Sequence, residues 1–118
     1  MVIVAVGTPQ ADDGRVDLRS LDGAVASLRE FAPPGTVVVI KSTVPPGTAV
    51  RVRTQLAGRE GVSVVSCPEF LREGSALHDV HHAARVVIGG DDPAAVARVR
   101  RLLEVPSAEV VLCDNMSA

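Results

Sequence analysis

Thr36–Lys41 reads TVVVIK, and this stretch decides the fold because its apolar residues follow one another without alternating with polar ones. An uninterrupted run of β-branched residues is typical of a strand that is covered on both faces, as in a parallel sheet. Four further runs have the same character, and they are Val2–Gly7, Val62–Ser66, Arg85–Gly90 and Glu109–Cys113. The sequence therefore predicts a mainly parallel sheet of buried strands.

Amphipathic helices are predicted between several of these strands, because apolar residues recur there at steps of three and four. The recurring residues are Leu18, Leu21, Val25, Leu28 and Ala32 in one segment, and Val96, Val99, Leu102 and Leu103 in another. Asp92 and Pro93 suit the N-cap and the first position of the second helix. A weaker helix is expected from about Thr48 to Leu56, ended by Gly58. Alternating strands and helices predict a three-layer α/β domain.

Length and composition restrict the class of protein. The 118 residues are 47% hydrophobic and 22% charged, which indicates one globular domain spanning residues 1–118. A net charge of −2 with two phenylalanines as the only aromatic residues argues against nucleic-acid binding. No apolar run approaches the roughly 18–20 residues that a membrane span needs. Cys67 and Cys113 are far apart without a CxxC motif, so we expect free thiols in a reducing cytoplasm.

Three predicted loops, Pro9–Arg15, Val44–Gly47 and Pro68–Gly74, follow the ends of strands. Because the carboxyl ends of parallel strands meet at one edge of a sheet, we expect a ligand site there. A further loop is predicted at His78–Ala84, which contains three histidines and Asp79. These side chains are interpreted as solvated, and no metal site is expected.

These loops contain several motifs that follow one another along the chain. They are Thr8-Pro9, Asp12-Asp13-Gly14, Lys41-Ser42-Thr43-Val44-Pro45-Pro46-Gly47-Thr48 and Cys67-Pro68-Glu69-Phe70-Leu71-Arg72-Glu73-Gly74. In this order and spacing they resemble the UDP-glucose/GDP-mannose dehydrogenase family over essentially the whole chain. The resemblance implies oxidation of a nucleotide sugar's primary alcohol to a carboxylate, in two hydride transfers to NAD⁺. It also implies that residues 1–118 are a partial Rossmann-like, NAD-binding domain without its first βαβ units.

The resemblance also assigns roles to individual residues. Thr8, Thr43 and Glu73 would bind the cofactor, and Thr43 would in addition hold the catalytic water. Glu69 would assist the acid–base chemistry, since a carboxylate can accept a proton through water. The implied contacts with the sugar nucleotide are Phe70, Leu71 and Arg72.

The two threonines have structural alternatives. Thr8 is followed by Pro9, which is also typical of a plain turn at the end of a strand. Thr43 could instead cap the helix that is expected to begin near Thr48.

The two glutamates have an alternative as well. Glu69 and Glu73 are four residues apart, so one helical turn would place both carboxylates on the same side. They could equally form a solvated surface cluster with Arg72 or Arg85.

The sequence contains no GxGxxG fingerprint, and the family's catalytic lysine and cysteine are absent, so we expect no turnover by this chain alone. An alternative function is a non-catalytic module that interacts with, or regulates, a longer relative. Without the opening βαβ units, one edge of the sheet is expected to be exposed. We therefore also expect a homo-oligomer or an aggregation-prone chain.

Overall fold

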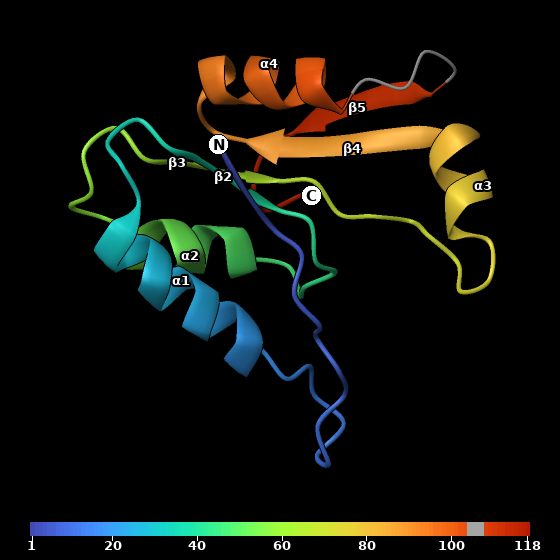
Figure 1. Ribbon diagram of the computed structural model, residues 1–118, viewed down its shortest axis with the longest axis horizontal. Coiled ribbons are helices and arrows are strands. Elements are labelled where there is room, and N and C mark those ends of the chain that lie inside the picture. The colour runs from blue at the N-terminus through green and yellow to red at the C-terminus, as the bar shows by residue number, and fades with distance from the viewer. Residues whose placement is uncertain (104–107) are drawn as a thin grey trace.

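The computed structural model describes residues 1–103 and 108–118, which form one sheet between helices (Figure 1). The strands are β1 (Val2–Val4), β2 (Val37–Ile40), β3 (Ser63–Ser66), β4 (Arg85–Gly90) and β5 (Glu109–Cys113). The helices are α1 (Arg19–Phe31), α2 (Thr48–Gln55), α3 (Ala76–His81) and α4 (Pro93–Leu102). The predicted α/β fold is confirmed.

The five strands lie in the order β1-β2-β3-β4-β5. β1 pairs with β2, β2 with β3, and β4 with β5, all in parallel. β3 and β4 are antiparallel, with Val65 opposite Gly90. The chain leaves the sheet after β3, passes through α3 and returns as β4 (Figure 1), so β4 runs against β3. The sheet is thus mainly parallel, as predicted.

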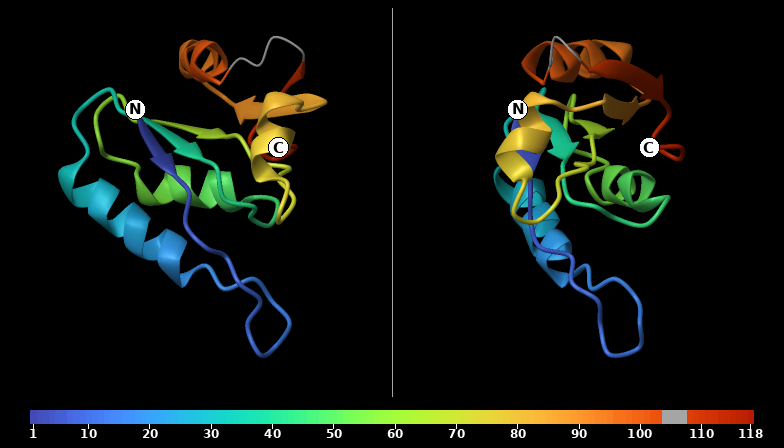
Figure 2. Two further views of the ribbon diagram at one scale, coloured as in Figure 1. Left: turned by 45° about the vertical axis from the view of Figure 1, so that its right-hand side comes forward. Right: turned by 90° about the vertical axis from the view of Figure 1, so that its right-hand side faces the viewer.

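α1 and α2 cover one face of the sheet and α4 covers the other (Figure 2). One core cluster joins Val38 and Ile40 of β2 to residues of α1 and α2. The other joins Val37 and Val39 of the same strand to Ala95 and Val99 of α4. Because both faces of β2 are covered, all four of its residues are buried, which is the reason for its uninterrupted apolar sequence.

The expectation that every strand is buried is wrong at the edges of the sheet. In β1 the side chain of Ile3 is 45% exposed, and in β5 that of Leu112 is 52% exposed. α1, α2 and α4 pack most closely on the central strands, so the edge strands keep part of their apolar surface in contact with solvent.

The loop predicted at His78–Ala84 is also wrong in its first half, because α3 spans Ala76–His81. Its first residues, Ala76 and Leu77, favour a helix, and the backbone N–H of His82 donates to the carbonyl of His78. None of the α3 residues is buried, so the apolar periodicity that reveals a packed helix is missing. α3 projects from the body of the molecule on an arm that comprises residues 68–84 (Figure 1).

Two other local signals are confirmed. Asp92 caps α4, since its Oδ1 accepts the backbone N–H of Ala94 at 3.0 Å. The helix expected from about Thr48 is α2, which ends at Gln55 ahead of Gly58 with its φ of 95°. Among the described residues, no helix has both the length and the apolar character required to cross a bilayer.

Candidate functional site

Ser42 joins the carboxyl ends of β1 and β2. Its hydroxyl accepts the backbone N–H of Val6 at 2.9 Å and donates to the carbonyl of Val6 at 2.7 Å. Ser42 is 7% exposed, so water has little access to this pair of hydrogen bonds. The serine was not singled out in the sequence, although the parallel pairing of the two strands brings it opposite Val6.

Beyond this junction the two predicted cofactor threonines are neighbours. The hydroxyl of Thr8 donates to the backbone carbonyl of Thr43 at 2.8 Å. Thr43 is exposed, and it does not cap α2, whose N-cap residue is Gly47 with a φ of 84°. Capping is therefore excluded as the role of Thr43, whose backbone carbonyl holds the Thr8 hydroxyl.

This strand-end surface has room for a cofactor. Gly7 precedes Thr8, and a Cβ atom added at Gly7 would meet no atom within 4 Å. Two hydroxyl-bearing residues thus lie next to open space at the carboxyl ends of parallel strands, where sheets of this kind bind ligands. The residues present are compatible with NAD, and contact of the two threonines with its nicotinamide end stays a prediction.

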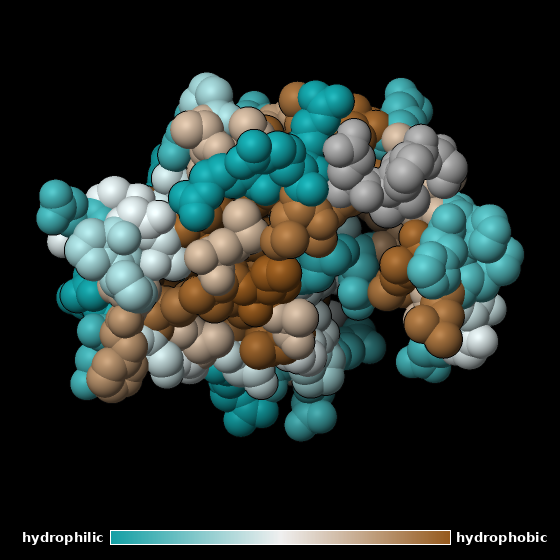
Figure 3. All heavy atoms as spheres, turned by 45° about the horizontal axis from the view of Figure 1, so that its top comes forward, coloured by the Kyte–Doolittle hydropathy of each residue, from teal (hydrophilic) through white to brown (hydrophobic). Residues whose placement is uncertain are grey.

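A cavity of about 650 Å³ lies between the first part of the arm and β4. The predicted residues Glu69, Phe70, Leu71 and Arg72 all line it. Figure 3 shows the hollow between the arm and the body of the molecule. Its other charged or titratable lining residues are Lys41, Cys67, Asp79, His82 and Arg85. The structure thus brings the proposed substrate residues together around one cavity.

Asp79 holds the loop that carries these residues. Its Oδ2 accepts the backbone N–H of Arg72 at 2.9 Å and the Nε–H of Arg72 at 3.1 Å. The Nη2 group of Arg72 donates to Oδ1 at 2.7 Å. These hydrogen bonds keep the pKa of Asp79 far below its ordinary value. From the sequence Asp79 was interpreted as solvated, because its partner Arg72 lies seven positions away and only the turn between them brings the two side chains together.

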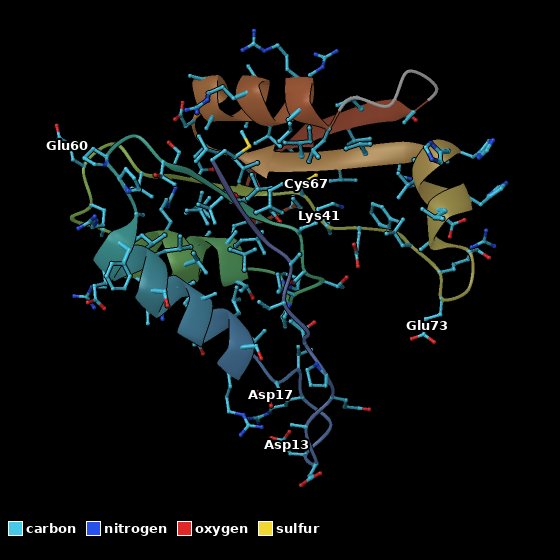
Figure 4. The ribbon with its side chains drawn as sticks, in the orientation of Figure 1. Asp13, Asp17, Lys41, Glu60, Cys67 and Glu73 are labelled. Carbon is cyan, nitrogen blue, oxygen red and sulfur yellow. The ribbon has the colours of Figure 1, made fainter. Side chains whose placement is uncertain are left out.

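The two glutamates do not share a helical turn, so that expectation is wrong. Residues 67–72 have no helical structure, and a turn follows at which Gly74 has a φ of 78°. Glu69 lines the cavity, whereas Glu73 is exposed outside its lining and points away from the body (Figure 4). The backbone N–H of Arg72 donates to Oδ2 of Asp79, so it does not make the helical hydrogen bond to the carbonyl of Pro68.

The alternative of a carboxylate–arginine cluster is not observed either. Arg72 pairs with Asp79, and in residues 1–103 and 108–118 no ion pair joins Glu69 or Glu73 to an arginine. The carboxylate of Glu69 is thus left available at the wall of the cavity.

Cys67 lies beside Lys41 at the inner end of the cavity (Figure 4). Burial raises the pKa of the Cys67 thiol, and the nearby charge of Lys41 opposes this only in part. A thiol with a raised pKa is protonated at neutral pH and is a poor nucleophile. The residues that the structure describes contain no group of three His, Cys, Asp or Glu side chains placed to hold a metal ion.

Comparisons with known proteins agree with this arrangement. The model of the NAD-binding domain of the UDP-glucose/GDP-mannose dehydrogenase family matches residues 1–105. A UDP-glucose 6-dehydrogenase of Bacillus subtilis is 38% identical over 122 residues, which cover 100% of this chain and 28% of the relative.

Solved structures give the same result. A UDP-glucose dehydrogenase from Pyrobaculum islandicum has a TM-score of 0.84 and 38% identity, over 98% of this chain and 28% of that one. A GDP-mannose dehydrogenase from Pseudomonas aeruginosa, solved as a ternary complex, has a TM-score of 0.85 and 27% identity. The match covers 98% of this chain and 29% of that one. The chain thus spans less than a third of the length of these relatives.

Proposed function

Because the chain belongs to the UDP-glucose/GDP-mannose dehydrogenase family, we propose that it forms part of an NAD-dependent nucleotide-sugar 6-dehydrogenase. Such an enzyme oxidises the primary alcohol of a sugar nucleotide to the uronic acid. The observation that carries the proposal is the cavity with Glu69, Phe70, Leu71 and Arg72 in its wall. Two free thiols, Cys67 and Cys113, support a cytoplasmic location.

The cavity suits a sugar nucleotide in size and chemistry. Its volume of about 650 Å³ lies within the roughly 300–1,000 Å³ of small-molecule sites. Phe70 and Leu71 offer apolar contact to a sugar ring or base, and Arg72 offers hydrogen-bond donors to oxygen atoms. Asp79 keeps Arg72 in one orientation, which lowers the entropy that binding costs.

In this proposal Glu69 is the proton acceptor. Its carboxylate is exposed at the cavity wall, so it can take a proton from a sugar hydroxyl through one water molecule. The role of Thr43 in holding the catalytic water stays a prediction, because Thr43 does not line this cavity. Thr8 supports Thr43 through its hydrogen bond to the Thr43 carbonyl. NAD⁺, when bound, accepts the hydride. The contact of Glu73 with the cofactor stays a prediction, because its side chain lies outside the cavity lining.

The two phenylalanines of the chain provide a matched test of the substrate site. Phe70 lines the cavity, whereas Phe31 ends α1 away from it, and their side chains are 59% and 73% exposed. Calorimetric titration with UDP-glucose should show an affinity at least about fivefold lower for Phe70→Ala, which corresponds to about 1 kcal/mol. Phe31→Ala should stay within about twofold of the unchanged chain. Equal affinities for the two variants, or no binding by the folded chain, would contradict the proposed substrate site.

The cofactor surface is tested separately with NAD⁺ as the titrant. Thr43→Val should weaken binding, because it removes the hydroxyl and keeps the shape of the side chain. Thr54→Val is the control, since Thr54 is an exposed threonine of α2 whose hydroxyl donates to the Val50 carbonyl of its own helix. If both substitutions have the same effect on NAD⁺ affinity, Thr43 does not contact the cofactor.

A further inference from the structure

The arm contributes two segments to the lining of the cavity. The first, which we call the outgoing wall, consists of Glu69, Phe70, Leu71 and Arg72. The second, which we call the returning wall, consists of Val80, His82, Ala83 and Ala84. The chain reverses between them at a turn, where Gly74 has a φ of 78°. The shape of the cavity therefore depends on the contacts within the arm that hold the two walls together.

Asp79 lies between the two walls and contacts both sides. Its Oδ2 accepts the backbone N–H and the Nε–H of Arg72, and its Oδ1 accepts from Nη2 of the same residue. On the other side, Nδ1 of His78 lies 3.7 Å from Oδ1. The His78 ring stacks on the ring of His82, with the two centroids 4.3 Å apart. Asp79 thus connects the outgoing wall to the returning wall, and its side chain is only 12% exposed.

The backbone hydrogen bonds around Asp79 form a closed local unit. The carbonyl of Arg72 accepts the N–H of Ser75 at 3.1 Å, and the carbonyl of Ser75 accepts the N–H of Asp79 at 2.9 Å. The carboxylate of Asp79 completes the ring by accepting the N–H of Arg72 at 2.9 Å. The backbone at the end of the outgoing wall is therefore fixed, and with it the place of Phe70, two residues earlier.

The ion pair of Arg72 and Asp79 also suits an anionic ligand. A carboxylate without a partner in the lining would repel the diphosphate of a sugar nucleotide. Here both oxygens of Asp79 are engaged by Arg72, which removes most of that repulsion. The bonds to Asp79 use the Nε–H and Nη2 groups of Arg72, so its Nη1 group can donate to a ligand.

We propose that Asp79 is a positioning residue of the substrate site, which holds Phe70 and Arg72 in the orientation that a sugar nucleotide binds. The proposal rests on the proposed function. Asp79 acts through Arg72, since that residue engages both of its carboxylate oxygens. A wall that is ordered before the ligand arrives lowers the entropy that binding costs, so the loss of Asp79 weakens binding.

The test is a double-mutant cycle, measured by calorimetric titration with UDP-glucose. Asp79→Asn keeps the size of the side chain but removes the charge that pairs with Arg72, and it should lower the affinity about fivefold. Asp79→Ala also removes the acceptor for the backbone N–H of Arg72, so its affinity should be lower still. In the double variant of Asp79→Asn and Phe70→Ala, the loss should be clearly smaller than the product of the two single losses. The reason is that a misplaced Phe70 has little contact left to lose.

Asp17 provides the matched control, because it makes the same kind of hydrogen bonds to an arginine in another part of the molecule (Figure 4). Its Oδ1 accepts the backbone N–H of Arg19 at 2.9 Å, and its Oδ2 accepts from Nη2 at 2.6 Å. The side chain of Asp17 is 16% exposed, and it does not line the cavity. Asp17→Asn should leave the affinity for UDP-glucose within about twofold, and its effect should multiply with that of Phe70→Ala.

A merely structural role of Asp79 would change a different quantity. It would lower the stoichiometry of binding, because part of the chain would be unfolded, whereas we expect a lower affinity at unchanged stoichiometry. Circular dichroism verifies that each variant folds, and Asp79→Ala replaces Asp79→Asn in the cycle if the latter does not.

Two results would overturn the proposal and leave the proposed function intact. One is an affinity of Asp79→Asn equal to that of the unchanged chain. The other is a full multiplication of the effects of Asp79→Asn and Phe70→Ala, which would show that the two residues act independently. No binding of UDP-glucose by the folded, unchanged chain would instead contradict the proposed function, and this proposal would fall with it.

Discussion

Replacing Ser42 by alanine removes the side chain that joins the ends of β1 and β2. The substitution deletes two hydrogen bonds, one from the N–H of Val6 and one to its carbonyl. Each contributes about 0.5–1.5 kcal/mol net, and Val6 is only half-buried, so water replaces part of the loss. We therefore expect the free energy of unfolding to fall by about 2 kcal/mol.

The assay is urea unfolding followed by far-ultraviolet circular dichroism. The midpoint should fall while the slope with urea stays unchanged, because the surface exposed on unfolding is the same. In a thermal scan, the loss corresponds to a Tm lower by roughly 6–10 °C for a domain of this size. Thr8 and Thr43 lie directly after Val6 and Ser42, whose hydrogen bonds the substitution removes, so NAD⁺ affinity should fall as well.

Ser27→Ala is the matched control for this prediction. Ser27 is an exposed serine of α1 whose hydroxyl donates to the carbonyl of Gly23 at 3.2 Å, and water can replace that bond. Alanine also favours a helix, so the free energy of unfolding should change by less than about 0.5 kcal/mol. If Ser42→Ala is no more destabilising than Ser27→Ala, the strand junction does not depend on the Ser42 hydroxyl.

Three further predictions concern packing and charge. Gly89→Ala should lower the free energy of unfolding, measured in urea, by about 1–3 kcal/mol, because the added Cβ would lie 2.6 Å from the carbonyl oxygen of Asp114. Gly23→Ala should not destabilise the chain, because a Cβ at Gly23 meets no atom within 4 Å. Ile88→Ala should lower the free energy of unfolding by about 2–5 kcal/mol, since Ile88 is 1% exposed in the core beneath α4. A smaller loss would mean that neighbouring side chains fill the space left by the removed atoms. The hydrogen bonds from Arg72 to Asp79 and from Ser63 to Asp92 lower the pKa of both carboxyl groups below 3.8. The stability that the two carboxylates contribute is therefore present above a pH of about 4 and is lost as the pH falls further. The urea midpoint should decrease over this range, and the decrease should be less steep in Asp79→Asn.

The local elements of this protein could be predicted from the sequence. The apolar run of β2 and the cap of α4 at Asp92 depend on neighbours within a few positions, and both are confirmed. α3 was missed because nothing packs on it, so its sequence carries no burial pattern. The helical turn assumed for Glu69 and Glu73 was wrong because the backbone N–H of Arg72 bonds to Asp79, seven residues away, and does not close a turn.

By itself, then, the sequence determined the α/β class, the strands and helices of the core, and the motifs by which the family is recognised. Only the tertiary structure decided that β4 runs against β3, that Glu69 but not Glu73 lines the cavity, and that Asp79 holds Arg72. It also decided that Ser42 joins two strand ends that are 36 residues apart in the chain. The physical reason is the range of the interactions. Helix and strand propensities act between near neighbours, whereas pairing direction and side-chain contacts depend on where distant segments meet in space.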